Sequence, residues 1–136
     1  MEIVQCTASD AEKLAELNRQ LIEDEQSDNR MTLPELVDRM RGFLDADYDA
    51  YFFLEGSETA GYALVRTSDE PLYLRQFFIC REYRRRHLGR EAFRLLLGTL
   101  GTDTLDIEVL SRNERGVRFW ENLGFKERSR YMRFSE

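Results

Sequence analysis

The sequence predicts one mixed α/β domain that spans residues 1–136 and is built around a mostly antiparallel sheet. Three observations lead to this class. The chain has the length of one ordinary domain, and 42% of its residues are hydrophobic, which is enough for a packed core. Apolar residues recur at helical spacing in four segments, and the region 51–80 has the pattern of strands separated by short turns. Helices and strands therefore follow one another in the order of a mixed domain.

The first 50 residues predict a short strand followed by two helices. Residues 1–7 alternate weakly between apolar and polar side chains, as a strand does. Ser9 to Glu12 has the spacing of a capping box, and leucines at helical spacing then continue to about Glu25. Thr32 to Glu35 is a second capping box with a proline in the first turn, so a second helix begins there.

The middle of the chain predicts three antiparallel strands. Residues 51–54 form an aromatic-rich strand, 55–58 a hairpin turn, and 60–67 its partner strand. A turn at 68–71 then leads into a strongly apolar strand over 72–80. Because consecutive strands joined by short turns pair antiparallel, these three form a meander.

The last third of the chain predicts a helix, a strand, a second helix and a final strand. Apolar residues recur at helical spacing over 88–100, and residues 105–109 alternate as a strand does. A helix over 114–123 ends at Gly124, which can adopt the left-handed cap conformation. Residues 125–134 are predicted to form one last strand or two short ones.

The charge distribution excludes one class of function and favours another. The chain has 20 basic and 26 acidic residues and a net charge of −6, so it is a poor general binder of nucleic acid. Within residues 81–94, however, six arginines stand against two glutamates. Such a basic island in an acidic chain favours a small anionic ligand, and the alternative is a solvated helix face with salt bridges.

Cysteine usage and hydropathy point to a reducing cytoplasm. Cys6 and Cys80 match no metal or redox spacing, so we expect neither a structural disulfide nor a metal site. The single histidine, His87, cannot build a metal site alone. No apolar run approaches the ~20 residues of a membrane span, and no signal peptide is visible at the N-terminus. The sequence therefore predicts a cytoplasmic protein without a membrane partner.

The junction over residues 79–90 joins an apolar strand to a helix with an apolar face. A helix start presents unpaired backbone amides and the positive end of its dipole, a combination that binds phosphates. Gly89 lets an anion approach the backbone closely, and the flanking arginines add charge and bidentate hydrogen bonds. The junction therefore predicts a binding site for a ligand that carries phosphate.

Residues 83–90 read Tyr-Arg-Arg-Arg-His-Leu-Gly-Arg. This segment resembles motif A of the GNAT superfamily of N-acetyltransferases, in which Arg or Gln is followed three residues later by Gly and five later by Gly or Ala. Arg84 fills the first position and Gly89 the last, and His87 replaces the middle glycine. We interpret His87 as a tolerated substitution and not as a titrating catalytic group, because the motif needs mainly a backbone amide at that place.

A second motif follows at the expected separation. Asn113 and then Phe-Trp-Glu-Asn-Leu-Gly-Phe, residues 119–125, are similar to the family's asparagine, helix, and Phe-Tyr-Glu-x-Leu-Gly-Phe ending. The resemblance covers nearly the whole chain and is weakest over residues 1–50. It implies the GNAT fold, with six to seven strands, about four helices, and a sheet splayed between strands 72–80 and 104–110.

The resemblance also implies acetyl-CoA as the cosubstrate, without a metal. The pyrophosphate would bind the backbone amides of residues 86–90, Arg84 would close the loop, and Arg85 would point to solvent or to the 3′-phosphate. The pantetheine arm would pair with the backbone of residues 77–79, and Asn113 would contact it or cap the last helix. The implied coenzyme-binding residues are Phe77, Phe78, Ile79, Arg84, Arg85, Arg86, His87, Leu88, Gly89, Arg90, Asn113 and Trp120.

Acetyl transfer needs a base, because an alkylamine with a pKa near ~10.4 is mostly protonated at neutral pH. Glu108 is the predicted base, since it stands in the strand that should border the thioester, five residues before Asn113. The alternative is a strand carboxylate paired with an arginine. Asp24 and Glu25, at the end of the first helix, are predicted to attract a cationic acceptor and are alternative bases.

The general acid is less clearly marked, because Trp120 stands where many family members have the tyrosine that protonates the leaving thiolate. An indole donates a hydrogen bond but is not a useful acid. We interpret Trp120 as a core aromatic residue or as packing on the pantetheine. Tyr131 and Tyr73 are the candidate acids, and direct release of a thiolate with a pKa near ~8.5 is the alternative.

The predicted function is transfer of the acetyl group of acetyl-CoA to a primary amine of a small molecule, peptide or protein, by direct attack in a ternary complex. The departures at His87 and Trp120 keep a catalytically weak acyl-CoA-binding or sensing domain as the alternative. Nucleic-acid binding by the arginine cluster is a third, weaker reading, because the chain is acidic and lacks a basic aromatic platform. The sequence leaves the acceptor undecided and a homodimer open.

Overall fold

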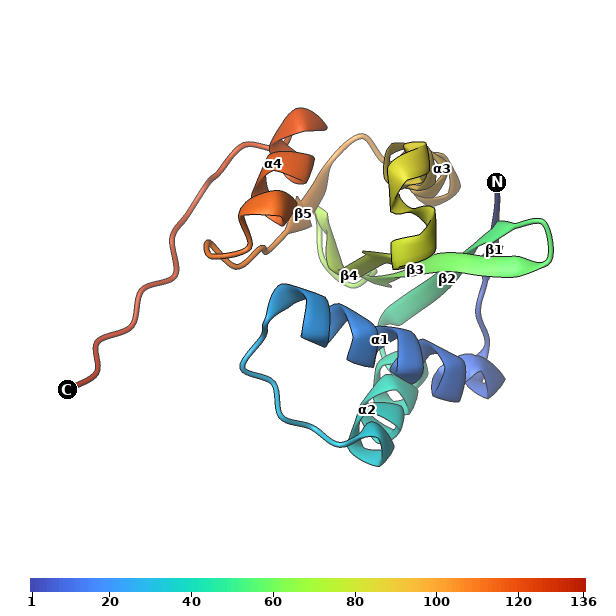
Figure 1. Cartoon of the computed structure of the whole chain (residues 1–136), viewed down its shortest axis with the longest axis horizontal. Coiled ribbons are helices and arrows are strands. Elements are labelled where there is room, and N and C mark those ends of the chain that lie inside the picture. The colour runs from blue at the N-terminus through green and yellow to red at the C-terminus, as the bar shows by residue number, and fades with distance from the viewer.

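The computed structural model describes residues 1–84 and 87–136 in full and, for residues 85 and 86, the backbone only. In this described part, five strands form one sheet, accompanied by four α-helices and two short 3₁₀ helices (Figure 1). None of these helices is both long enough and apolar enough to cross a membrane. The elements are β1 (Glu2–Gln5), η1 (Ala8–Asp10), α1 (Ala11–Glu25), α2 (Leu33–Asp45), β2 (Tyr48–Glu55), β3 (Glu58–Arg66), β4 (Leu72–Ile79), η2 (Arg81–Arg86), α3 (Leu88–Leu100), β5 (Leu105–Ile107) and α4 (Glu114–Asn122).

The sheet has the strand order β1-β2-β3-β4-β5. The first four strands pair antiparallel, and β5 pairs parallel to β4 after the crossover through α3. The mixed α/β class and the number of α-helices agree with the sequence prediction. The number of strands does not, because the described residues form five strands instead of six or seven.

Helices cover both faces of the sheet. Figure 1 shows α1 and α2 on one side and α3 on the other, and α4 lies beyond β5. The core between these layers is formed by fully buried side chains of the central strands and α1, such as Phe53, Tyr62 and Leu14. The two faces of β4 therefore meet different elements.

The two helix starts of the N-terminal half have different outcomes. The capping box before α2 is confirmed, because the Thr32 amide donates to the Glu35 carboxylate at 2.8 Å and Thr32 Oγ1 accepts from the Glu35 amide at 3.4 Å. The box expected at Ser9 is wrong by two residues, since the Thr7 amide donates to the Asp10 carboxylate at 2.8 Å. The cause is the 3₁₀ turn η1, which begins before α1 and moves the first free amides toward the N-terminus.

A β-bulge in β4 changes the direction of its side chains. The pairing register between β3 and β4 shifts at this point, because Leu64 pairs with Gln76 and the next residue, Val65, pairs with Leu74. Arg75 is therefore an extra residue without a partner on β3. A bulge of this kind bends the strand and redirects the side chains beside it.

The parallel pair of β4 and β5 is short. Pairing begins at Leu72 with Leu105 and ends at Leu74 with Ile107. The predicted strand over 104–110 is thus reduced to Leu105–Ile107, whereas β4 continues to Ile79. Beyond Leu74, this edge of β4 has no strand beside it in the described part of the chain.

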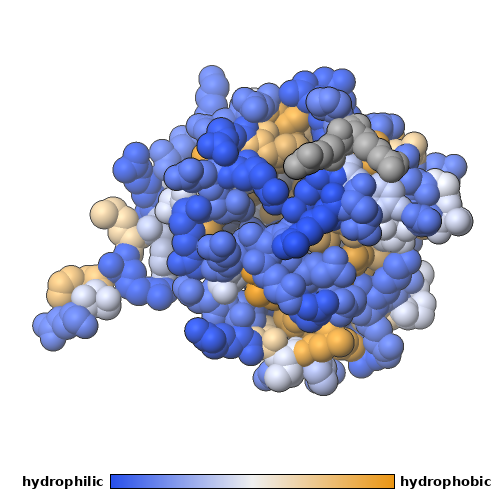
Figure 2. Space-filling view, in the orientation of Figure 1, coloured by the Kyte–Doolittle hydropathy of each residue, from blue (hydrophilic) through white to orange (hydrophobic). Residues whose placement is uncertain are grey.

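The strand predicted over residues 125–134 is absent from the described structure. Phe125 packs against Phe93 and Trp120, but the chain then leaves the domain as an extended segment (Figure 1), whose apolar residues are visible at the surface in Figure 2. Five consecutive polar residues, 126–130, precede Tyr131 and Met132, which would point to opposite faces of a strand. The segment therefore lacks the single apolar face that a surface strand needs.

Candidate functional site

The junction between β4 and α3 is a 3₁₀ turn followed directly by a helix start. His87 connects them with φ 59° and ψ 21°, in the left-handed region that glycine adopts most easily. The amides of Leu88, Gly89 and Arg90 follow in the first turn of α3, where an α-helix has no acceptor for them. The conformation explains why a glycine would be favoured at position 87, and it leaves the amides of the helix start available.

Gly89 is needed for packing at this helix start. A Cβ atom at Gly89 would lie 3.0 Å from Cε1 of Phe119 and 3.3 Å from its Cζ, closer than ordinary van der Waals contact. Phe119 in turn stacks on Phe77, with ring centroids 6.1 Å apart. The absence of a side chain at Gly89 therefore lets α4 approach both α3 and β4.

Aromatic rings fill the α3 side of β4. Trp120 makes edge contacts with Phe77 at 5.2 Å, Phe93 at 5.7 Å and Phe125 at 5.2 Å between ring centroids. This packing agrees with the interpretation of Trp120 as a core aromatic residue. Asn113 lies at the start of the same helix, and its side chain accepts a hydrogen bond from the Gly116 amide at 3.1 Å. Asn113 therefore caps α4, one of the two roles expected for it.

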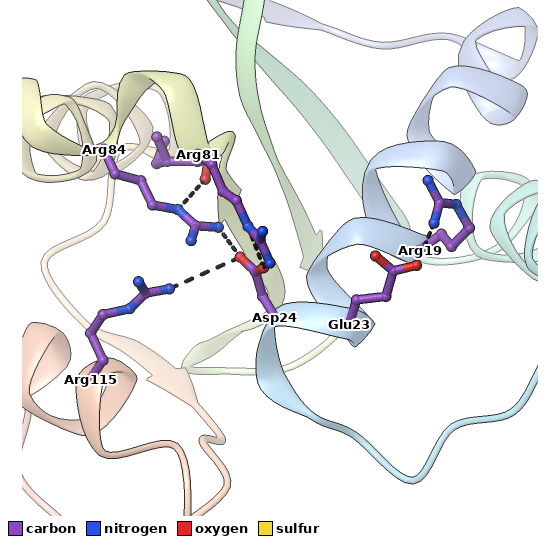
Figure 3. A network of polar contacts seen from close by, with 7 residues as sticks. Arg19, Glu23, Asp24, Arg81, Arg84 and Arg115 are labelled. Atoms are coloured by element: carbon purple, nitrogen blue, oxygen red, sulfur yellow. Dashed lines mark hydrogen bonds and ion pairs between the residues drawn. The ribbon is translucent and has the colours of Figure 1, made fainter.

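Asp24, at the end of α1, is surrounded by three arginines, two from η2 and one from α4 (Figure 3). Arg81 donates two hydrogen bonds to its carboxylate at 2.8 and 3.1 Å, Arg84 donates another, and Arg115 of α4 approaches to 4.0 Å. The Asp24 side chain is only 9% exposed. Burial disfavours its ionised form, but the hydrogen bonds from Arg84 and Arg81 outweigh burial and lower the pKa of Asp24.

This network changes the role expected of two residues. Because Asp24 is neutralised by arginines, it has no free charge with which to attract a cationic acceptor. Arg84 also donates to the carbonyl oxygen of Ile79 at 2.8 Å and lies 5.2 Å from the Phe78 ring, so it joins α1 to the end of β4 instead of reaching outward. The side chains of Arg85 and Arg86, also predicted to contact the coenzyme, lie outside the described residues.

The outer side of the junction is a shallow basic hollow of about 330 Å³. His87 and Arg90 are exposed at its edge, whereas Leu88 is buried and anchors α3 in the core. The hollow extends from His87 along the first two turns of α3. Its lining residues are His87, Arg90, Glu91, Arg94 and Leu95.

The α1 and α2 side of β4 carries a polar cluster that sequence reasoning missed. The buried Tyr62 hydroxyl donates to Oε1 of Gln76 at 2.8 Å, and Arg39 donates to Oδ1 of Asn18 at 2.9 Å. Asn18 and Gln76 are both buried. One signal could have revealed them: each is a polar residue at a position where the helix or strand pattern calls for an apolar one.

Glu25 lies beside this cluster. It is half-buried and has neither an ion pair nor a hydrogen bond in the described part of the chain. Burial, followed by repulsion from Asp24, raises the pKa of Glu25. Its charge also contributes to the raised pKa of Tyr62, which is caused mainly by burial. Glu25 is therefore an unpaired carboxyl group over β3 and β4.

The two predicted catalytic residues lie apart. Glu108 is exposed just beyond the end of β5 and close enough to Tyr73 to contribute to its raised pKa, for which burial is the main cause. Tyr131 lies in the extended C-terminal segment, where 84% of its side chain is exposed and Arg133 donates to its hydroxyl at 2.9 Å. The structure thus brings Tyr73, and not Tyr131, near Glu108.

Comparison with known proteins now decides the family. Residues 13–125 match the acetyltransferase (GNAT) family. This chain belongs to that family. No curated protein sequence matches it.

Solved structures share the GNAT fold along the whole chain. A mutant of the BH1408 protein from Bacillus halodurans is 18% identical with a TM-score of 0.80, and the match covers 100% of this chain and 99% of the other. A possible acetyltransferase from Clostridium difficile 630 is 15% identical with a TM-score of 0.80, and the match covers 99% of this chain and 96% of the other. Aminoglycoside N-acetyltransferase AAC(6')-Iy, solved with CoA, is 16% identical with a TM-score of 0.73, over 99% and 93% of the two chains. At these identities the likeness concerns the fold.

Proposed function

We propose that this acetyltransferase transfers the acetyl group of acetyl-CoA to a primary amine by direct attack in a ternary complex. The observation that carries the proposal is the edge of β4 from Arg75 to Ile79, which has no strand beside it among the described residues and leads directly into the start of α3. An extended ligand with phosphates at one end matches this arrangement, because a strand edge offers hydrogen bonds and the amides of a helix start attract anions.

In this proposal the coenzyme binds mainly to the backbone. The pantetheine arm pairs with residues 77–79, and the pyrophosphate accepts hydrogen bonds from the amides of Leu88, Gly89 and Arg90. The basic hollow beside His87 and Arg90 holds the remaining phosphate charge. Arg84 acts indirectly, because its contacts with Asp24 and Ile79 position the end of β4.

Two carboxylates are candidates for the base. Glu108 is on the β5 side, and Glu25 is on the α1 side with a raised pKa. A carboxylate whose pKa is raised toward neutrality is the better general base. We therefore propose Glu25 as the base, with Glu108 as the competing assignment.

The thioester carbonyl is attacked by the neutral amine, the C–S bond breaks, and the amine proton passes to the base. The coenzyme then leaves as a thiolate or takes a proton from the hydroxyl of Tyr73, which is protonated at neutral pH and whose pKa burial raises further. Trp120 supplies packing and not a proton.

Calorimetry with acetyl-CoA and thiol release across a panel of amines test the proposal. We expect salt-sensitive coenzyme binding and acetylated products visible by mass spectrometry. Glu25→Gln should lose most of the rate and the low-pH limb of the pH–rate profile, whereas Glu108→Gln should keep both. The reverse result would move the base to Glu108. Binding without thiol release from any amine would instead favour the coenzyme-sensing alternative, and no binding at all would overturn the proposal.

A further inference from the structure

Two arginines converge on one aromatic ring on the α2 side of the sheet. The guanidinium carbon of Arg39, from α2, lies 5.5 Å from the centroid of the Phe43 ring, and that of Arg75, from the β4 bulge, lies 4.8 Å from it. Arg75 also contacts the ring of Tyr48 at 6.0 Å. Stacking on aromatic faces holds both guanidinium groups in place without a counter-ion.

Neither arginine has a carboxylate partner in the described part of the chain. Arg39 is half-buried, and its Nη2 atom donates to Asn18. Its Nε atom is buried and has no hydrogen-bond partner among the described residues. Arg75 is exposed, and its one hydrogen bond is a long donation of 3.4 Å to the Tyr48 hydroxyl. Several guanidinium donors of this pair therefore have no hydrogen-bond partner among the described residues.

The electrostatics of the pair favour an anion. Burial lowers the pKa of Arg39, and repulsion from Arg75 lowers it further, so the charged form is disfavoured from two sides. A carboxylate between them would remove the repulsion and accept the free hydrogen bonds in the bidentate geometry that guanidinium groups favour.

The position of this pair relates it to the proposed reaction. Arg75 directly precedes the stretch of β4 that would hold the pantetheine arm, so it lies at the thioester end of that stretch. Glu25 acts on Tyr62 from the same side of the sheet, and so does Arg39. Glu25, Arg39 and Arg75, none of which has an ion-pair partner among the described residues, therefore share one face of the sheet.

We propose that Arg39 and Arg75 bind a carboxylate of the acceptor, and that the acceptor is an amine that also carries a carboxylate, as an amino acid does. The amine is placed on the Glu25 side and the carboxylate on the arginine side. This inference rests on the proposed acetyl transfer and narrows its substrate class.

The test compares each carboxylic acid with its uncharged carboxamide. Amino acids with the amine at increasing distance from the carboxylate, and short peptides with a free carboxyl end, are assayed beside their carboxamides. We expect kcat/KM for the acid to exceed that for the carboxamide by about tenfold or more, the effect of hydrogen bonds to a charged group. The length series separates a free amino acid from a peptide end.

Three variants locate the effect. Arg75→Gln and Arg39→Lys should reduce the preference for the acid, the first nearly to parity. Because Arg75 is exposed, its removal leaves the core intact. Arg41→Gln is the matched control on α2, since Arg41 is exposed and pairs with Glu12 and Asp38. It should keep the wild-type preference.

A binding measurement makes the result independent of turnover. N-acetyl amino acids and their amides are titrated by calorimetry into the protein saturated with CoA, and we expect only the acids to bind well. Equal handling of acids and amides by the wild type, or an unchanged preference in Arg75→Gln, overturns the inference. Failure of the proposed function looks different, because acetyl-CoA itself would then not bind or no amine would be acetylated.

Discussion

Two groups of arginines lie along β4, and they differ in whether the protein supplies their counter-ion. At the end of the strand, Arg81 and Arg84 share the buried carboxylate of Asp24, which ties α1 to the junction. At the bulge, Arg39 and Arg75 stack on Phe43 without a carboxylate. The same residue type therefore stabilises the fold in one place and leaves an anion site open in the other.

The largest expected effect comes from removing the shared counter-ion. Asp24→Ala would leave Arg84, which is 22% exposed, without its partner, and we expect a loss of about 3 kcal/mol in the free energy of unfolding. Urea denaturation measures it. Asp28→Ala is the control, because Asp28 is 92% exposed beside Arg112 and its loss should change stability by less than about 0.5 kcal/mol. Similar effects of the two variants would contradict a structural role for Asp24.

The pH dependence of this effect follows from the lowered pKa of Asp24. A carboxyl group with a depressed folded-state pKa adds stability above its unfolded value, near ~3.9, and loses it as the pH falls through the folded-state value. The difference between the wild type and Asp24→Ala should therefore be full at neutral pH and shrink in acid below about pH 4. A constant difference down to the lowest accessible pH would argue against an ionic origin.

A smaller effect should follow from crowding the junction itself. Gly89→Ala places a Cβ 3.0 Å from Phe119, and we expect a loss of about 2 kcal/mol and weaker coenzyme binding. Gly98→Ala, in the same helix with nothing within 4 Å, should instead stabilise by up to about 1 kcal/mol. Thermal unfolding and calorimetry with CoA measure both. If both variants were stabilised, Gly89 would not be needed for packing.

Replacing His87 tests the backbone of the same junction by removing a side chain instead of adding one. His87→Gly relieves a left-handed conformation at φ 59° and should stabilise the protein by about 1 kcal/mol. The variant should bind the coenzyme as tightly as the wild type at every pH, because the proposed site uses backbone amides of the helix start and not the imidazole. A pH-dependent loss of affinity would instead assign His87 a titrating role. Gln26→Gly, at φ 52° after α1, is a matched left-handed position outside the β4–α3 junction and should give a similar gain in stability.

The smallest expected effect tests the bulge pair. Arg75→Gln removes a like charge beside Arg39, so stability should rise or stay within about 0.5 kcal/mol of the wild type. This sign is opposite to that of Asp24→Ala and separates an open site from a structural one. A large loss of stability in Arg75→Gln would show that both groups of arginines stabilise the fold.

The sequence predicted best where the signals are local. The capping box at Thr32, the meander and the strand-to-helix junction depend on residues within a few positions of each other, and the structure confirms them. Family membership followed from two short motifs. The prediction of a final strand was wrong, because alternation alone does not show which edge of the sheet a strand would pair with. Residues 126–130 also offer no apolar face.

The polar interior was the part that local patterns could not predict. Arg84 and Asp24 are 60 positions apart, and sequence reasoning assigned one to the coenzyme and the other to the acceptor. Arg39 and Arg75 likewise meet only because α2 packs over the bulge of β4. Charged side chains are long and find partners from any element, so their sequence positions do not reveal their neighbours.

By itself, the sequence determined the family and most of the elements and predicted a place for the coenzyme, because helix starts, turns and backbone amides are properties of short segments. Only the tertiary structure decided which charges are neutralised and which remain open. Burial and partner distance set the state of Asp24, Glu25 and the two arginine groups, and both quantities exist only once α1 and α2 have packed on the sheet.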